Sequence, residues 1–254
     1  MLARRLKGSL KGLLAQRGYE LSRLPDRGPF EAQRRLLLGH RVRTVFDLGA
    51  FVGDVTARYR SLFPDATVYS FEPFAGSFET LAERFRGDEF VKPQPLAVAD
   101  QVGAAVLYVN GLAATNSLLP RPSEGQRYFP SDGETVATER VRTTTIEAFC
   151  GEHGLATIDV LKLDVQGGEL AALRGAEGLL RKRAVGLIYT EASFVPHYRG
   201  APLFHDVAAL LAGHGYGLYN IYDMVRARNG QLRFADALFV SPAVRRRAID
   251  DPPL

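Results

Sequence analysis

The sequence predicts an α/β fold: a mostly parallel sheet of seven strands with an antiparallel last strand, covered by helices. Three observations support this prediction. Short apolar runs alternate with longer segments of helical periodicity, the order expected for parallel strands joined by helical crossovers. Acidic residues stand at the ends of three of these runs, at Asp47, Glu72 and Asp164. A glycine turn at Gly49 follows the first of them and leads into a helix, so we expect a ligand at the carboxyl edge of the sheet.

In the first half of the chain, each element is identified by its apolar period or by a residue that ends it. Helical spacing of apolar residues precedes the first strand, and Pro64 ends the helix that follows this strand. A turn signal at 101–103 predicts a hairpin. In order, we expect a helix over 29–39, a strand over 44–48, a helix over 53–63, a strand over 67–71, a helix over 75–86, a strand over 89–97 and a returning strand over 104–109.

The second half opens with a break in this order. Residues 110–133 are rich in proline and glycine, which predicts a long loop, and Tyr128 and Phe129 near its end suit a lid over a substrate. The alternation then resumes and ends in a hairpin at 228–230. We expect an extended segment over 135–142, a helix over 144–153, a strand over 158–163, a helix over 169–183, a strand over 185–190, a helix over 203–213 and strands over 216–222 and 232–240.

Length and charge predict a basic N-terminal helical arm over 1–40 and one large domain over 41–254. Residues 1–43 hold 11 Lys and Arg against 3 acidic residues, so the rest of a chain of net charge +4 is slightly acidic. This distribution disfavours a nucleic-acid groove around the site. The single cysteine, Cys150, excludes an internal disulfide.

Three roles are open for the basic arm. It packs on the domain, mediates a homodimer, or makes a peripheral contact with an anionic membrane. Gly8 and Gly12 each cost an isolated helix about 1 kcal/mol, which favours packing or dimerisation. No apolar run reaches the roughly 18 residues of a membrane span, and none forms a signal-peptide core. We therefore expect a cytoplasmic protein.

The residues around the first two strands point to a nucleoside cofactor. Glu72 is placed to accept the two ribose hydroxyl protons. A dinucleotide would need glycines where Phe51 and Asp54 stand, because bulk and negative charge exclude a pyrophosphate there. Asp47 instead suits a cationic ligand, and S-adenosylmethionine carries an ammonium and a sulfonium group. We predict S-adenosylmethionine, with these candidate contacts: Asp47, Gly49, Ala50, Gly53, Glu72, Pro73 and, near the adenine, Asp100.

Five blocks of sequence resemble the FkbM-type methyltransferases. They are Val-Phe-Asp-Leu-Gly-Ala (45–50), Phe-Glu-Pro (71–73), Leu-Lys-Leu-Asp-Val-Gln-Gly-Gly-Glu-Leu (161–170), Leu-Arg-Gly-Ala (173–176) and Tyr-Thr-Glu (189–191). The resemblance implies a class I methyltransferase fold, which is Rossmann-like, and S-adenosylmethionine-dependent O-methylation, often of sugar hydroxyls in glycans or of hydroxyls on secondary metabolites. Phe51 stands where the family commonly has asparagine, and Gln166 stands where it often has glutamate.

Methylation of a hydroxyl needs a base or a metal ion beside the acceptor, because an alcohol is a poor nucleophile at neutral pH. The candidate catalytic residues are Asp164, Glu191, which ends the next strand, and His197 in the loop after it. In one mechanism His197 or Asp164 is the general base. In the other, Asp164 and Glu191 hold a divalent cation such as magnesium. The sequence does not decide between these two mechanisms, so no residue is assigned as a metal ligand.

The acceptor is expected to be a small molecule or glycan. Candidate substrate contacts are Asn116 and Ser117 in the long loop and Tyr198 beside His197. The chain lacks the Asn/Asp-Pro-Pro-aromatic run that amino-group methyltransferases use, which favours O-methylation. Two rival functions are a non-catalytic S-adenosylmethionine-binding protein and a nicotinamide-dependent oxidoreductase. Two further charged residues have structural interpretations: we expect Lys162, inside an apolar strand, to form an ion pair, and Glu169 to cap the following helix.

Overall fold

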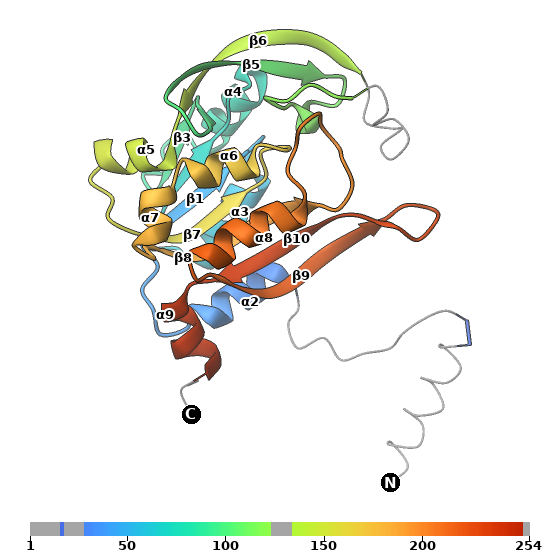
Figure 1. Ribbon diagram of the computed structural model, residues 1–254. Coiled ribbons are helices and arrows are strands. Elements are labelled where there is room, and N and C mark those ends of the chain that lie inside the picture. The colour runs from blue at the N-terminus through green and yellow to red at the C-terminus, as the bar shows by residue number, and fades with distance from the viewer. Residues whose placement is uncertain (1–15, 18–27, 123–133, 251–254) are drawn as a thin grey trace.

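The computed structural model describes residues 16–17, 28–122 and 134–250. Its central sheet has seven strands in the order β3-β2-β1-β7-β8-β10-β9 (Figure 1). All pairs are parallel except those that β10 makes with its two neighbours. The strands are β1 (Thr44–Leu48), β2 (Thr67–Phe71), β3 (Val91–Gln94), β7 (Ile158–Leu163), β8 (Val185–Ser193), β9 (Gly217–Arg226) and β10 (Leu232–Val240). The predicted sheet and its reversed last strand are confirmed.

Helices cover both faces of this sheet (Figure 1). On one face lie α5, α6, α7 and α8, and on the other lie α2, α3 and α9, each set over its own hydrophobic core. Side chains of β7 divide between the two cores by alternation: Leu161 and Leu163 enter one, and Val160 enters the other. The helices are α2 (Pro29–Leu36), α3 (Asp54–Leu62), α4 (Ala75–Arg84), α5 (Ile146–Glu152), α6 (Glu169–Arg174), α7 (Glu177–Arg181), α8 (Phe204–Gly213) and α9 (Pro242–Arg245).

Helix α2 is part of this body. Its Phe30 and Leu36 are buried with Val45 of β1 and Tyr59 of α3, and the Tyr59 hydroxyl donates a hydrogen bond to Gln33. The helix therefore packs beneath the sheet although it lies within the arm expected over 1–40. Most of that arm, and the lid residues Tyr128 and Phe129, lie outside the described residues.

A second, three-stranded sheet corrects the hairpin predicted near 101–103. Strands β4 (Ala97–Val98), β5 (Gly103–Asn110) and β6 (Thr135–Thr144) pair in the order β4-β6-β5. The chain does turn between β4 and β5, but β6 lies between them and pairs with both. The single strand predicted over 89–97 is likewise divided between the two sheets. Local turn chemistry predicts where a chain reverses, but the long-range partner decides the pairing.

Two helical predictions also change. The helix predicted over 169–183 is two helices, α6 and α7, separated at Gly175. A Cβ on Gly175 would lie 2.3 Å from the Ala99 carbonyl oxygen, so the chain packs too closely there for any larger residue. The C-terminal helix α9 and the turn η3 (Arg246–Asp250) were not predicted. Ser241 caps α9 by accepting a hydrogen bond from Val244 N–H.

Candidate active site

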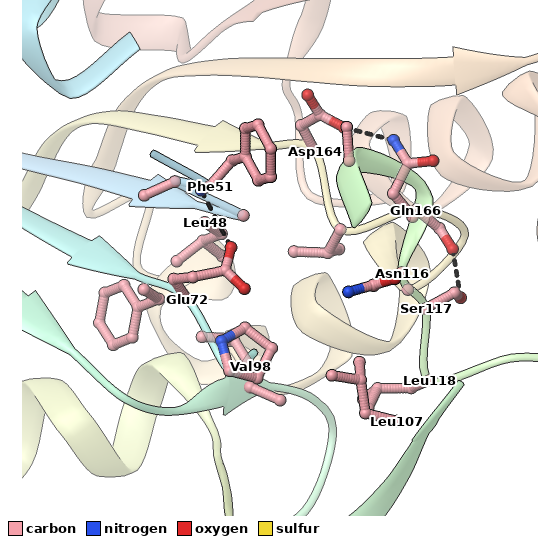
Figure 2. A pocket seen from close by; sticks show the side chains of 18 of the residues that line it. Leu48, Phe51, Glu72, Val98, Leu107, Asn116, Ser117, Leu118, Asp164 and Gln166 are labelled. Carbon is pink, nitrogen blue, oxygen red and sulfur yellow. Dashed lines mark hydrogen bonds between the residues drawn. The ribbon is translucent and has the colours of Figure 1, made fainter. Parts of the chain in front are cut away.

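A cavity opens at the carboxyl ends of β1, β2 and β7, against strands β4 and β5 of the second sheet (Figure 2). The cavity volume is about 230 Å³, and its mouth is open to solvent. Glu72 faces the cavity from one side, and Asp164 with Gln166 stands on the other. The apolar part of its wall is formed by Leu96, Ala97 and Val98 around β4, Leu107 of β5, and Leu118.

Glu72 is fixed by two backbone hydrogen bonds. Its Oε2 accepts from Phe51 N–H and its Oε1 from Phe74 N–H, each at 2.9 Å. The side chain is buried, and burial raises the pKa of the carboxyl above its ordinary value, although the two donors partly oppose that shift. Each oxygen keeps a lone pair for a further donor, so Glu72 can accept hydroxyl protons from a ligand beside Pro73.

The glycine turn after β1 is fixed by close packing. Gly49 and Ala50 both donate to the Phe71 carbonyl oxygen, at 3.0 and 2.9 Å. A Cβ on Gly49 would lie 1.8 Å from the Asp164 carbonyl oxygen, so only glycine lets the turn meet the loop after β7. Phe51 adopts a left-handed conformation, φ 49°, which asparagine tolerates better than phenylalanine. The backbone therefore suits the asparagine that the family resemblance implies at this position better than it suits phenylalanine.

Three of the predicted cofactor residues lie outside the cavity lining: Gly53, Asp100 and, beneath the cavity, Asp47. Gly53 (φ 90°) caps α3, and a Cβ there would meet the side chains of Leu81 and Phe85. Its contacts are therefore with the α4 region. Asp100 is exposed, and Ala97 and Val98 line the cavity where Asp100 was expected to lie.

Asp47 lies beneath the cavity and is fully buried. Its Oδ1 is 3.0 Å from Lys162 Nζ, and its Oδ2 accepts a hydrogen bond from the Thr56 hydroxyl at 2.7 Å. Lys162 also donates to the carbonyl oxygens of Leu48 and Gly49. The predicted ion pair of Lys162 is confirmed. These residues form the floor of the site, and Asp47 acts on the turn through Lys162.

Asp164 and Gln166 form the rim at the far end of the cavity. The Asp164 side chain is 43% exposed and lines the cavity. Gln166 donates from Nε2 to Asp164 Oδ1 at 2.8 Å and to Glu191 Oε2 at 3.3 Å. Glu191 is half-buried and is outside the cavity lining. Burial, and then the charge of Asp164, raise its pKa well above the ordinary value.

Two acids behind the rim were not assigned a chemical role from the sequence. Glu169 Oε1 accepts from the N–H groups of Val165 and Gly167, so it holds the loop before α6. Burial raises the pKa of this carboxyl to about 7. Asp236, opposite Glu191 in the antiparallel register, accepts from the Tyr189 hydroxyl, and burial raises its pKa to about 6. Only the pairing of β8 with β10 places Asp236 beside Glu191.

The predicted substrate residues lie together, whereas His197 does not reach the cavity. Asn116 and Ser117 line it, and Tyr198 is buried behind Gln166 with His197 packed on its ring, 4.3 Å between centroids. Asn116 Oδ1 accepts from Asn110 N–H at 2.8 Å. This turns Nδ2 toward the cavity (Figure 2), where no described residue accepts from it. A buried donor without an acceptor costs about 1–3 kcal/mol, and an acceptor atom of a ligand would remove that cost.

These features fit S-adenosylmethionine. An apolar wall beside Pro73 suits an adenine ring, Glu72 suits the ribose, and the unpaired Asn116 donor suits a polar atom of the ligand. For a divalent cation the fit is poorer: over the described ranges, no group of three or more His, Cys, Asp or Glu side chains is arranged to hold a metal ion. The magnesium mechanism stays a prediction.

The sheet order and the acid-bearing pocket at its carboxyl edge define a class I S-adenosylmethionine-dependent methyltransferase. Within that class, the chain belongs to the family of the methyltransferase FkbM domain, whose model matches residues 47–218. The predicted family and reaction class, S-adenosylmethionine-dependent O-methylation, are confirmed.

Two characterised proteins are similar in sequence. The 31-O-demethyl-FK506 methyltransferase FkbM of Streptomyces tacrolimicus is 29% identical over 195 residues, 68% of this chain and 72% of that protein. The 2-O-methyltransferase NoeI of Sinorhizobium fredii is 26% identical over 162 residues, 61% of this chain and 65% of NoeI. The chain thus matches somewhat under two thirds of NoeI.

Two solved structures are similar to this chain at low sequence identity. Fibrillarin of Aeropyrum pernix with bound S-adenosyl-L-methionine is 14% identical with a TM-score of 0.43, over 78% of this chain and 66% of that one. Precorrin-6y C5,15-methyltransferase of Geobacter metallireducens is 10% identical with a TM-score of 0.44, over 84% and 86%. Among the helices that the structure describes, none has the length and apolar character to cross a membrane.

Proposed function

We propose that this methyltransferase acts on a hydroxyl group of a sugar, a glycan precursor or a natural product, with Asp164 as the general base. The observation that carries the proposal is the placement of the partly exposed Asp164 on the cavity wall across from Glu72. The names of the two relatives support the acceptor class, since one refers to O31 of FK506 and the other to a 2-O position.

The proposed cofactor site uses residues from four segments. Glu72 accepts the ribose hydroxyls, and Ala97 and Val98 pack on the adenine. The turn at Gly49 and Ala50 approaches the methionine part, and Asn116 Nδ2 donates to a polar atom of the ligand. S-adenosylmethionine supplies a methyl group on a sulfonium, which is already a good leaving group. The protein's remaining tasks are alignment and removal of one proton.

Asp164 suits the base better than His197 does. Its carboxylate accepts the proton of the acceptor hydroxyl, which frees the oxygen's electron pair for the new bond to the methyl carbon. His197 is buried against Tyr198 and does not line the cavity. The alternative, in which Asp164 and Glu191 hold a divalent cation, would require a cation to displace the Gln166 amide from between them.

Transfer of a labelled methyl group from S-adenosylmethionine to pooled glycans and hydroxylated metabolites tests the proposal. We expect label on an acceptor oxygen, undiminished by a chelator. If a chelator abolishes transfer and magnesium restores it, the mechanism with Asp164 as general base is wrong, and a divalent cation activates the acceptor hydroxyl instead. Binding of S-adenosylhomocysteine without transfer to any hydroxyl would refute the proposed acceptor class.

The remaining expectations concern the surroundings of the enzyme, and we retain them as proposals. The basic N-terminal segment gives the chain a homodimer contact or a peripheral contact with an anionic membrane, and the protein works in the cytoplasm. Measuring the oligomeric state and the binding to anionic vesicles separates the first two.

A further inference from the structure

Gln166 occupies an unusual position between two acids. Its Nε2 is within hydrogen-bond distance of both Asp164 Oδ1 and Glu191 Oε2, at 2.8 and 3.3 Å (Figure 2). One amide group therefore supplies a hydrogen to each carboxyl. Lys162 Nζ lies 3.9 Å from Asp164 Oδ2. Without the amide, the two carboxyl groups from neighbouring parallel strands would face each other with no amide between them, which is unfavourable when both are ionised.

The orientation of this amide is set by Tyr198. The Tyr198 hydroxyl lies 2.7 Å from Gln166 Oε1 and 2.9 Å from the carbonyl oxygen of Thr115, and its one hydrogen is shared between these two acceptors. With Oε1 turned to Tyr198, the NH₂ group of Gln166 must face the two acids. The reverse orientation would place Oε1 against two carboxyl groups, so the two acids and the Tyr198 hydroxyl favour the same orientation of the amide.

The backbone of Gln166 is also held in place. Its φ is 52°, in the left-handed region that few residues other than glycine adopt, and such strain persists only where neighbouring contacts over-determine it. The Ser117 hydroxyl supplies one such contact by donating to the Gln166 carbonyl oxygen at 2.6 Å. Glu169 supplies others through the N–H groups of Val165 and Gly167 on either side. The strained position thus aims the side chain at the acids.

We propose that Gln166 is a positioning residue of the acceptor site: its amide, oriented by the Tyr198 hydroxyl, joins Asp164 to Glu191 and keeps the Asp164 carboxylate turned toward the acceptor. This rests on the proposed role of Asp164 as base. The amide fills the place between two carboxyl groups that a bridging cation fills in a metal-dependent enzyme. Through Tyr198, which contacts Thr115, and through Ser117, Gln166 also connects the two acids to residues 115–117 beside the cavity.

The test compares four variants of the full chain. Gln166→Met keeps the length of the side chain and removes the amide, and Tyr198→Phe keeps the ring and removes the hydroxyl. The double variant joins the two changes. Gln101→Met, at an exposed glutamine in the turn between β4 and β5, is the matched control. For each variant we would measure kcat and KM with a hydroxyl acceptor, the Kd for S-adenosylhomocysteine and the thermal midpoint.

We expect Gln166→Met to lower kcat about 10- to 100-fold, a loss typical of residues that orient a reactive group, with the Kd for S-adenosylhomocysteine unchanged. Tyr198→Phe should lower kcat less, and the double variant should resemble Gln166→Met, because both residues act through one amide. An unchanged kcat in Gln166→Met would overturn the proposal, as would losses that multiply in the double variant. A wild-type protein inactive on every hydroxyl would instead refute the proposed function, leaving the two failures distinguishable.

Discussion

The floor and the rim of the cavity hold charged groups in opposite ways. In the floor, Asp47 and Lys162 are almost fully buried, and their pair is surrounded by the Thr56 hydroxyl and two carbonyl oxygens. At the rim, Asp164 is partly exposed. It accepts a hydrogen bond from the amide of a strained residue, and Lys162 Nζ lies 3.9 Å from its Oδ2. The floor has few ways to rearrange, whereas the rim leaves lone pairs open to a ligand.

This contrast separates two uses of an acid at the carboxyl end of a parallel strand. A buried, paired charge fixes the shape of the turn that a cofactor rests on, and it is costly to disturb. A half-exposed charge can exchange a proton with a bound molecule. Asp47 and Asp164 both stand near the carboxyl end of a parallel strand, but only Asp164 lines the cavity. The following predictions test whether the two regions divide stability and catalysis as this contrast implies.

Removing the cation of the floor should have the largest effect. Lys162→Met leaves Asp47 buried without its partner, and breaking such a pair costs about 3–5 kcal/mol. We expect that loss in the free energy of unfolding, measured by denaturant titration. Lys92→Met, at an exposed lysine of β3, is the control and should change little. A loss below about 1 kcal/mol would show that the floor is not what stabilises this end of the sheet.

Removing the charge of the rim should affect rate and leave stability nearly unchanged. Asp164→Asn keeps the shape of the side chain and removes the base, so kcat should fall at least about 100-fold, equivalent to roughly 3 kcal/mol. Asp65→Asn, at an exposed aspartate before β2, should match the wild type in the same methyl-transfer assay. Full activity of Asp164→Asn would show that another residue is the general base.

Glu169 lies behind the rim and should make stability depend on pH. The unfolded chain releases this proton near pH 4.5, whereas the folded protein holds it up to about pH 7. The folded state therefore binds more protons in this window, and the free energy of unfolding falls as pH rises through it. Glu169→Gln keeps the acceptor oxygen and removes the titration, so this fall should shrink by at most about 3 kcal/mol.

The check is denaturant unfolding of Glu169→Gln between pH 4.5 and 7. Glu177→Gln changes an acid in the first turn of the next helix, where the side chain is 52% exposed, and should keep the wild-type dependence. A wild-type curve that rises with pH across this window would contradict the raised pKa of Glu169.

Glu72 should show the smallest of the four effects. Glu72→Gln keeps one acceptor oxygen and loses the other, so we expect binding of S-adenosylhomocysteine to weaken about tenfold, or roughly 1.4 kcal/mol. Calorimetry measures the Kd directly, and Glu79→Gln on the exposed side of α4 serves as the control. An unchanged Kd would remove Glu72 from the ribose site.

Much of the fold could be predicted because short stretches of sequence specify the strands and the turns that follow them. Strand β7 is an apolar run bounded by polar residues, and β1 and β2 end in the turn and acid that mark a nucleoside site, so these strands and their parallel direction could be predicted. The second sheet could not be predicted, because β4 and β6 are joined only by a pairing across more than 35 residues of sequence. Nor could the split between α6 and α7, which depends on the approach of Ala99 to Gly175.

The candidate site divides in the same way. The sequence by itself determined which acids end the strands, that Glu72 and Asp164 share one edge of the sheet, and that Lys162 needs a partner, because each follows from strand alternation and burial. Only the tertiary structure decided that Asp47 lies under the cavity, that His197 is kept from it, and that Gln166 links two acids. Those outcomes depend on side-chain directions and distances between separate segments, which no local pattern records.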